Sequence, residues 1–257
     1  MNGISVVIIC KNEESSIERV LLSLQGLTDD IVVYDNGSTD DTVEKVKKFP
    51  VNLQQGSWEG FGKTKQKATC FAKYDWILSL DADEAVDEEL KKSLKELQPE
   101  DAKTVYDIAF RNYIGQQYLK YGEWGGDHHI RLYNRTIVNW DETPVHEQLI
   151  IPADVRVKKI NGHVLHQTVK DMSDYSRKMI RYAMLNADKY FHQGKKATWF
   201  KVRISPGFTF IHYYLLRLGF LDGHAGYVCA KMTAWYTFLK YARLRELWNE
   251  QQGQPGI

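Results

Sequence analysis

The chain has 257 residues, and its 34 lysines and arginines almost balance its 33 aspartates and glutamates. A hydrophobic content of 43% with only 6 prolines and 18 glycines excludes a disordered or collagen-like chain and suffices for a substantial core. The charge is unevenly distributed. Residues 151–257 carry a net charge of +10 and residues 1–150 a net charge of −9. This asymmetry indicates that the two parts meet different partners.

The cysteines and the apolar runs predict the compartment. Cys10, Cys70 and Cys229 are odd in number and lack C-x-x-C spacing, which argues against a disulfide scaffold or a zinc ribbon and suits a reducing compartment. The first apolar run ends at Lys11, so we read no signal peptide. No apolar run is long enough to suggest a membrane span. We therefore expect a cytoplasmic protein.

The first 150 residues alternate between strand and helix patterns. The run Ile4–Cys10 is rich in β-branched residues, which predicts a strand buried on both faces. A helical pattern follows Ser15, a candidate N-cap. Further strands are predicted over 31–34, 51–54, 76–80, 104–110 and 129–133, with helices over 41–48 and 62–72. This alternation predicts an α/β fold built from βαβ crossovers around a doubly wound sheet.

Beyond Val169 the strand patterns fade and long helical patterns replace them. These cover residues 173–191, 200–218 and 224–248. We therefore expect two domains, an acidic α/β domain over 1–168 and a basic, aromatic helical extension over 169–257.

Three predicted strands end in polar segments. The first ends in "CKNEE", the second in "DNGSTDD" and the fourth in "DADE". Ligands bind at the carboxyl ends of strands in open α/β sheets. The spacing of Asp81 and Asp83 suits a shared divalent cation, although an Asp-rich turn that caps a helix is the alternative for an isolated D-x-D. The convergence of three such strand ends favours a ligand site.

The two earlier strand ends supply hydrogen-bond acceptors. Asp35 is suited to accept from the imide N–H of a pyrimidine, and Glu13 from a ribose hydroxyl. Neither G-x-G-x-x-G after the first strand nor a P-loop occurs in the sequence, which disfavours a dehydrogenase and a P-loop enzyme. Any phosphate is therefore expected to be held by metal and side chains.

Four segments in order, "ISVVIICKNEE", "VVYDNGSTDDT", "FGKTKQKA" and "WILSLDADE", resemble the family 2 glycosyltransferases. The resemblance covers residues 3–150. It implies a GT-A fold, which is Rossmann-like with a mostly parallel sheet flanked by helices. It also implies inverting transfer of a sugar from a nucleotide-sugar, usually with Mg²⁺ or Mn²⁺.

The resemblance also implies roles for single residues. Glu13 and Asp35 would contact the nucleoside, and Asp81 would lie near the ribose. Asp83 would bind the metal. Lys65 occupies a position where many members carry an arginine that reaches the base or the phosphates.

An inverting transferase needs one base to take the proton of the attacking acceptor hydroxyl. Many members supply it from a second carboxylate pair, and the corresponding segment here reads "DETPVHEQL". We assign the base to Glu147, with Asp127, Asp141 and Glu142 as alternatives. A glycosidase would instead need two opposed carboxyl groups and no nucleotide site.

Several other polar or aromatic residues carry two interpretations each. Arg131 and Arg135 would either clamp phosphates or form ordinary salt bridges. Trp124 would either stack on a sugar or pack in the interior. A zinc site at His163 and His166 is disfavoured, because no cysteine lies at ligand spacing.

The helical extension mixes aromatic and basic residues, which suits the membrane–water interface. The alternative is a helical subdomain with lysines and arginines on its wet face. We expect no nucleic-acid partner, because no recognition motif is present. The segments "RLGFLDGHAGY" and "TFLKYARL" are similar to bacterial lipopolysaccharide core glycosyltransferases that add a hexose, often glucose. That similarity implies an anionic glycolipid acceptor and peripheral contact with the inner face of the cytoplasmic membrane, and family habit favours UDP as the nucleotide.

Two rival functions follow from other classes. A sugar nucleotidyltransferase would need a Gly-rich basic loop after the first strand, which "CKNEES" lacks. A non-catalytic glycan- or membrane-binding relative is disfavoured because Asp81 and Asp83 are both present.

Overall fold

The computed structural model describes residues 3–99, 101–141 and 148–253, and these form two compact units. The sheet unit comprises the residues up to Arg111 together with Asp127–Gln167. The helical unit comprises Asn112–Gly126 and the residues from Thr168 onward. The segment 112–126 therefore groups with the helices, although it comes from the middle of the α/β sequence.

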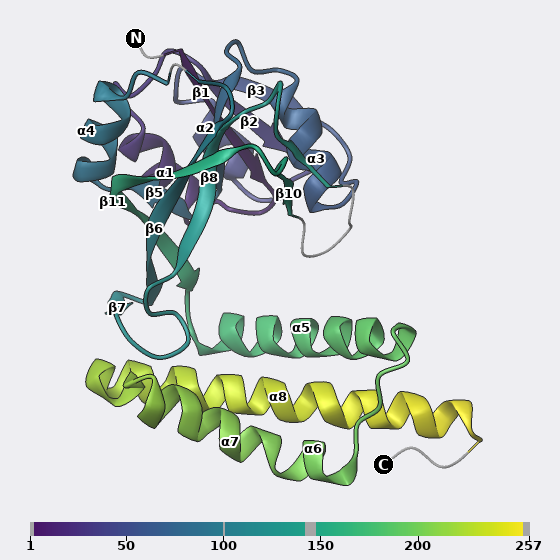
Figure 1. Cartoon of the computed structure of the whole chain (residues 1–257). Helices are drawn as coiled ribbons and strands as arrows, with labels where there is room; N and C mark the ends of the chain where they lie inside the picture. Colours follow the sequence, from purple (N-terminus) through teal and green to yellow (C-terminus); the bar gives the residue numbers. More distant parts are fainter. Residues whose placement is uncertain (1–2, 100, 142–147, 254–257) are drawn as a thin grey trace. The chain divides into compact units, whose positions relative to one another are not determined.

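The main sheet has the strand order β3-β2-β1-β4-β8-β6-β11-β5 (Figure 1). Neighbouring strands are parallel from β3 to β4, whereas β8 is antiparallel to both β4 and β6. The strands of this path are β1 (Ile4–Cys10), β2 (Ile31–Asp35), β3 (Asn52–Gln55), β4 (Trp76–Asp81), β5 (Glu84–Val86), β6 (Thr104–Ile114), β8 (His128–Asn134) and β11 (Arg156–Val169). A small separate sheet pairs β9 (Asn139–Trp140) with β10 (Leu149–Ile150). The predicted α/β class is confirmed.

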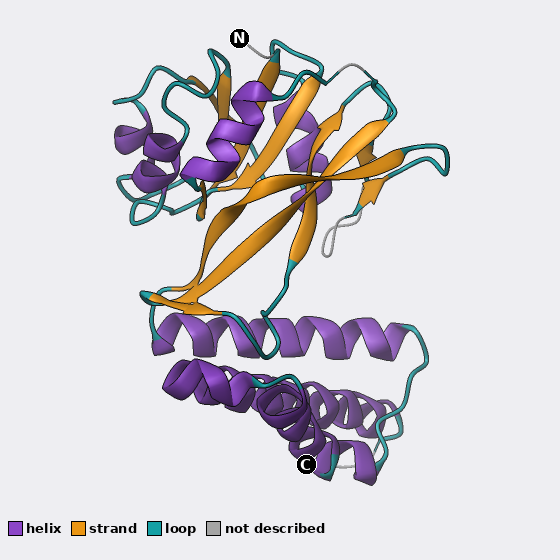
Figure 2. Ribbon diagram, turned by 60° about the vertical axis from the view of Figure 1, so that its left-hand side comes forward, coloured by secondary structure: helices purple, strands orange, loops and turns teal. Residues whose placement is uncertain are grey.

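Helices cover both faces of the sheet (Figure 2). All seven residues of β1 are buried, as the apolar run predicted, and they alternate between two cores. Val6 and Ile8 face the core shared with α1 and α4, whereas Val7 and Ile9 face the core shared with α3. The helices of this unit are α1 (Ile17–Ser23), α2 (Thr42–Val46), α3 (Phe61–Thr69) and α4 (Glu88–Glu96).

Among the strands that were not predicted, β11 and β5 shape the site. The first residues of β11 are exposed and rich in lysine and arginine, so they lack the apolar signal on which strand prediction depends. Short β5 lies inside what the sequence suggested was a turn, and it pairs antiparallel with β11 so that Glu84 lies opposite His166. These two strands bring residues 84 and 166 together.

In the helical unit, the long helix α8 packs against both α5 and α7 (Figure 1). The predicted single helix over 200–218 is divided into α6, α7 and a π-helical turn. Pro206 stands in the first turn of α7, and proline cannot donate the backbone hydrogen bond that would continue α6 through this point. The elements are β7 (Gln117–Leu119), α5 (Met172–His192), α6 (Trp199–Arg203), α7 (Ser205–Ile211), η1 (His212–Leu216), η2 (Gly219–Asp222) and α8 (Gly223–Gln251). None of the described helices is both long and apolar enough to cross a bilayer.

The segment "GFLDGHAG" is explained by close packing inside the helical unit. A Cβ on Gly226 would lie 1.9 Å from the carbonyl oxygen of Gly219, so only glycine fits at this contact. The Asp222 carboxylate accepts a hydrogen bond from the backbone N–H of Tyr121 at 2.8 Å, and its carbonyl accepts one from Gln117 at 3.0 Å. The segment therefore anchors residues 117–121 to the start of α8.

Candidate active site

The polar segments that follow β1, β2 and β4 lie at one edge of the sheet. Cys10 pairs with Asp35, and Ile9 pairs with Asp81, so the three strand ends are adjacent. The carboxyl ends of parallel strands are where α/β folds bind ligands. The structure thus brings Asp35 and Asp81 to neighbouring positions at the end of β1.

The segments after β1 and β2 hold each other in place. Asn12 adopts a left-handed backbone conformation, and its side-chain oxygen accepts from the Thr39 N–H at 2.8 Å. The Glu13 N–H donates to the Thr42 hydroxyl at 2.7 Å, and the Glu13 carboxylate accepts from the Ser16 hydroxyl at 2.6 Å. Glu13 is half-buried. Its carboxylate is therefore oriented by its own loop.

Asp35 is completely buried, and its carboxylate is already surrounded by donors. It accepts from the backbone N–H groups of Gly37 and Ser38 at 3.2 Å and from Gln55 at 3.3 Å. Gly37 has a φ of +81°, which side chains disfavour, so glycine suits this turn. Asp35 therefore organises the loop, in addition to whatever it binds.

Asp81 lies between two cations. The Lys65 Nζ is 3.0 Å from one carboxylate oxygen, and Arg131 is 3.2 Å from the other. Lys65 is 2% exposed, and its Nζ lies 4.7 Å from the centre of the Trp140 ring. Burial by itself would raise the pKa of Asp81, but Lys65 and then Arg131 outweigh it and hold that pKa well below its usual range. Asp81 is therefore ionised and fixed.

Glu84 also belongs to this network, because it binds both Arg131 and the backbone of Asp81. Its carboxylate accepts from Arg131 at 2.5 Å and from the backbone N–H of Asp81 at 3.0 Å. Its side chain is 1% exposed, and burial raises its pKa although Arg131 opposes the shift. Of the two interpretations of Arg131, the structure thus shows the salt-bridged one. Arg135 likewise binds Asp75 and two backbone carbonyl groups.

Asp83 points to a different partner. Its carboxylate is 3.5 Å from the His166 Nε2, and its carbonyl accepts from Arg19 at 2.8 Å. Burial by itself would lower the pKa of His166, but the hydrogen bond and the charge of Asp83 outweigh it and raise that pKa. The Asp83 carboxylate is an oxygen ligand of the kind that Mg²⁺ and Mn²⁺ prefer.

Glu147 and Glu142 lie outside the described residues, but the chain on either side of them is described. Asp141 donates its N–H to the Gln148 carbonyl at 2.9 Å, and its carboxylate accepts from the Gln148 N–H at 3.0 Å. The preceding residue is Trp140, whose ring contacts Lys65. The carboxylate of Asp127, an alternative base, lies 3.1 Å from the His129 Nε2. Asp141 and Gln148, which flank the segment 142–147, are therefore bound to each other, and Asp141 directly follows the residue that contacts Lys65.

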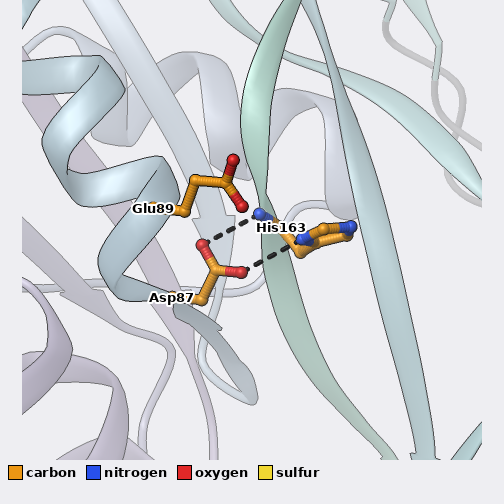
Figure 3. A group of neighbouring side chains, drawn as sticks. All are labelled: Asp87, Glu89 and His163. Atoms are coloured by element: carbon orange, nitrogen blue, oxygen red, sulfur yellow. Dashed lines mark hydrogen bonds and ion pairs between the residues drawn. The ribbon is translucent and has the colours of Figure 1, made fainter.

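A second carboxylate–imidazole group has a structural explanation. Asp87, Glu89 and His163 offer ligand atoms within 4.8 Å of one another (Figure 3). Both oxygens of Asp87 are engaged. One accepts from the N–H groups of Leu90 and His163 at 2.8 and 3.0 Å, and the other lies 3.1 Å from His163 Nδ1. Asp87 thus caps α4 and ties it to β11.

Two of the residues that shape this site escaped sequence reasoning. The sequence presents His166 only as part of an H-x-x-H spacing, because β11 lacks a local strand signal and no sequence pattern places His166 near Asp83. Glu84 stands in "DADE", but its role depends on strand β5. Trp124, in turn, packs 5.6 Å from the Tyr175 ring inside the helical unit, as the packing interpretation expected.

Several known proteins are similar to this chain. Residues 5–149 match the family model described as glycosyl transferase family 2. An uncharacterised glycosyltransferase of Rickettsia typhi is 30% identical over 96% of this chain and 88% of its own. The lipopolysaccharide core biosynthesis glycosyltransferase LpsC of Rhizobium meliloti is 28% identical over 94% of this chain and 91% of its own. The crystal structure of Staphylococcus aureus TarS 1–349 with UDP-GlcNAc aligns over 98% of this chain and 92% of its own, with a TM-score of 0.49 and 16% identity.

The sheet topology and the family match together define an enzyme that transfers glycosyl groups on a GT-A fold. The chain belongs to glycosyltransferase family 2, and the resemblance of its four sequence segments is confirmed.

Proposed function

We propose that this chain is a metal-dependent inverting hexosyltransferase that moves a hexose, with glucose the expected one, from a UDP-sugar to a lipid-linked anionic acceptor such as the lipopolysaccharide inner core. The observation that carries the proposal is the ionised Asp81, fixed between Lys65 and Arg131 at the edge where β1 and β2 end. The name of the LpsC relative supports the choice of acceptor.

Each residue has one task in this proposal. Glu13 and Asp35 accept hydrogen bonds from the nucleoside, and Asp81 accepts from the ribose. Lys65 and Arg131 keep Asp81 charged and oriented, so no reorganisation is needed when the donor binds. Asp83, with His166 beside it, would hold Mg²⁺ or Mn²⁺, which when bound neutralises charge on the diphosphate.

The transfer is one in-line displacement. The acceptor hydroxyl attacks the anomeric carbon, its proton passes to the carboxylate of Glu147, and the bond from that carbon to the diphosphate oxygen breaks. The products are the new glycoside, with inverted configuration, and the nucleoside diphosphate. Asp127, Asp141 and Glu142 remain the alternatives for the base.

The test measures UDP release from UDP-glucose with Mn²⁺, with GDP- and dTDP-sugars in parallel. We expect Asp83→Asn to lose roughly 10²–10³-fold in rate. Asp154→Asn is the matched control, because Asp154 is exposed and pairs only with the exposed Lys103 among the described residues. If the wild type neither binds nor turns over any nucleotide-sugar, the proposal fails. Formation of UTP and glucose 1-phosphate from UDP-glucose and added pyrophosphate, without release of UDP, would instead indicate a nucleotidyltransferase.

A further inference from the structure

The segment from Trp199 to Leu221 of the helical unit exposes an unusual number of large apolar side chains. Phe200 is 66% exposed, Phe208 63% and Leu216 66%. Helices α6, α7 and η1 contain no buried residue at all. Single exposed apolar residues are ordinary, but a contiguous set marks an interaction site. We call this set the apolar face: Trp199, Phe200, Ile204, Phe208, Ile211, Leu215, Leu216, Leu218, Phe220 and Leu221.

The segment that contains the apolar face is positively charged. Residues 189–221 contain six lysines and arginines and no aspartate or glutamate. The basic residues are Lys189, Lys195, Lys196, Lys201, Arg203 and Arg217. A surface that is both apolar and cationic matches the interface of an anionic membrane, where acyl chains lie below phosphate groups.

A groove opens between α6–α7 and α8, and it adjoins the apolar face at Trp199, whose ring contacts Arg203 of the groove lining. Its volume is about 550 Å³, and Pro206, Trp235 and Phe238 are among the residues that line it. Arg203 and Lys231 stand in the same lining. The groove therefore combines an apolar floor with two cations, and its volume falls within the range of small-ligand sites.

The two cations of the groove are held by aromatic rings. The Arg203 guanidinium lies 4.6 Å from the Trp199 ring, and the Lys231 Nζ lies 4.7 Å from the Phe210 ring. Neither forms an ion pair with a carboxylate in the part of the chain that the structure describes. A phosphate group would supply the counter-charge that the protein does not.

We propose that the apolar face and its groove bind anionic phospholipid: the exposed side chains enter the membrane interface, one acyl chain lies in the groove, and Arg203 and Lys231 bind the headgroup phosphate. A second copy of this chain is the less suitable occupant, because a symmetric contact would set six basic residues against the same six. This inference rests on the proposed function in one respect, since it names the surface that brings the enzyme to a lipid-linked acceptor.

The first experiment is co-sedimentation with vesicles of phosphatidylcholine, alone or mixed with phosphatidylglycerol. We expect binding only to the anionic vesicles, and weaker binding as salt rises. Replacing both groove cations, Arg203→Gln with Lys231→Gln, should weaken binding about thirtyfold, which corresponds to about 2 kcal/mol. The matched control is Lys158→Gln with Lys159→Gln, an exposed pair on β11. An equal loss of vesicle binding in both double variants would mean that only net charge matters, and it would overturn the assignment of the phosphate to the groove.

The second experiment locates the acyl chain. Brominated acyl chains quench nearby tryptophan fluorescence. In a Trp199→Phe background, which removes the tryptophan of the apolar face, Trp235→Phe should therefore remove much of the remaining quenching, whereas Trp58→Phe in the sheet unit should remove little. Unchanged quenching in Trp235→Phe would overturn the groove assignment. Equal binding to neutral and anionic vesicles, or a stable dimer that binds no vesicle, would overturn the lipid assignment.

Failure of this inference and failure of the proposed function are distinguishable. UDP-glucose turnover without lipid tests the proposed function alone, and the groove variants should leave it unchanged. A protein that binds anionic vesicles but no nucleotide-sugar would refute the enzyme proposal and keep the lipid site. A protein that turns over UDP-glucose but does not bind vesicles would refute the lipid site and keep the enzyme proposal.

Discussion

Replacing Arg131 by glutamine tests whether the buried charge network stabilises the sheet unit. Arg131 binds Glu84 at 2.5 Å and Asp81 at 3.2 Å. The Glu84 side chain is 1% exposed and that of Asp81 35% exposed. The stability effect should therefore come mainly from Glu84, because the charge of Asp81 is partly screened by water.

Removing one partner of a buried ion pair leaves an uncompensated charge, which costs about 3–5 kcal/mol. For a unit of this size, about 2–4 °C per kcal/mol converts that range into a fall in Tm of about 6–20 °C. The assay is thermal unfolding followed by circular dichroism, with Glu84→Gln and the double variant in the same buffer.

The double variant tests whether Arg131 and Glu84 stabilise the fold through their contact with each other. Because Glu84→Gln removes the charge that Arg131 neutralises, it should restore a large part of the stability lost in Arg131→Gln. The coupling free energy between the two sites should reach about 0.5–3 kcal/mol. Additive effects, or an Arg131→Gln variant as stable as the wild type, would refute the account of the network.

Three further predictions concern the base, a buried acid and a glycine contact. Glu147→Gln should keep donor binding but lose roughly 10²–10⁴-fold in transfer; normal transfer would give the role to Asp127, Asp141 or Glu142. Burial raises the pKa of Glu123, which accepts from the Thr233 hydroxyl. The carboxyl therefore favours the folded state fully below its unfolded-state pKa and loses that contribution as the pH rises through the higher folded-state pKa. Glu123→Gln should accordingly gain stability relative to the wild type at neutral pH and lose that advantage in acid, and a difference independent of pH would contradict this. Gly226→Ala should destabilise the helical unit by about 1–3 kcal/mol, because its Cβ would meet the Gly219 carbonyl. Gly207→Ala, which meets nothing within 4 Å, should not destabilise in a urea titration.

The parallel half of the sheet and the edge that carries the candidate site were predictable from sequence. The run Ile4–Cys10 is apolar at every position except Ser5 and rich in β-branched residues, as expected for a strand covered on both faces. Because β1, β2 and β4 are parallel neighbours, the polar residues that follow them had to meet at one edge. Glu13, Asp35, Asp81 and Asp83 could therefore be selected as site candidates from local pattern alone.

The partners of those residues depended on tertiary structure. Strand β11 begins with exposed basic residues, so its pairing with β5 left no local signal, and with it the contact of His166 with Asp83 was unpredictable. Arg131 likewise reaches Asp81 and Glu84 only because β8 lies beside β4 in the folded sheet. Local sequence reports which residues are apolar, charged or turn-forming, because those properties act over a few residues. The pairing of charged residues depends on strands that are distant in sequence, and only the folded chain brings those strands together.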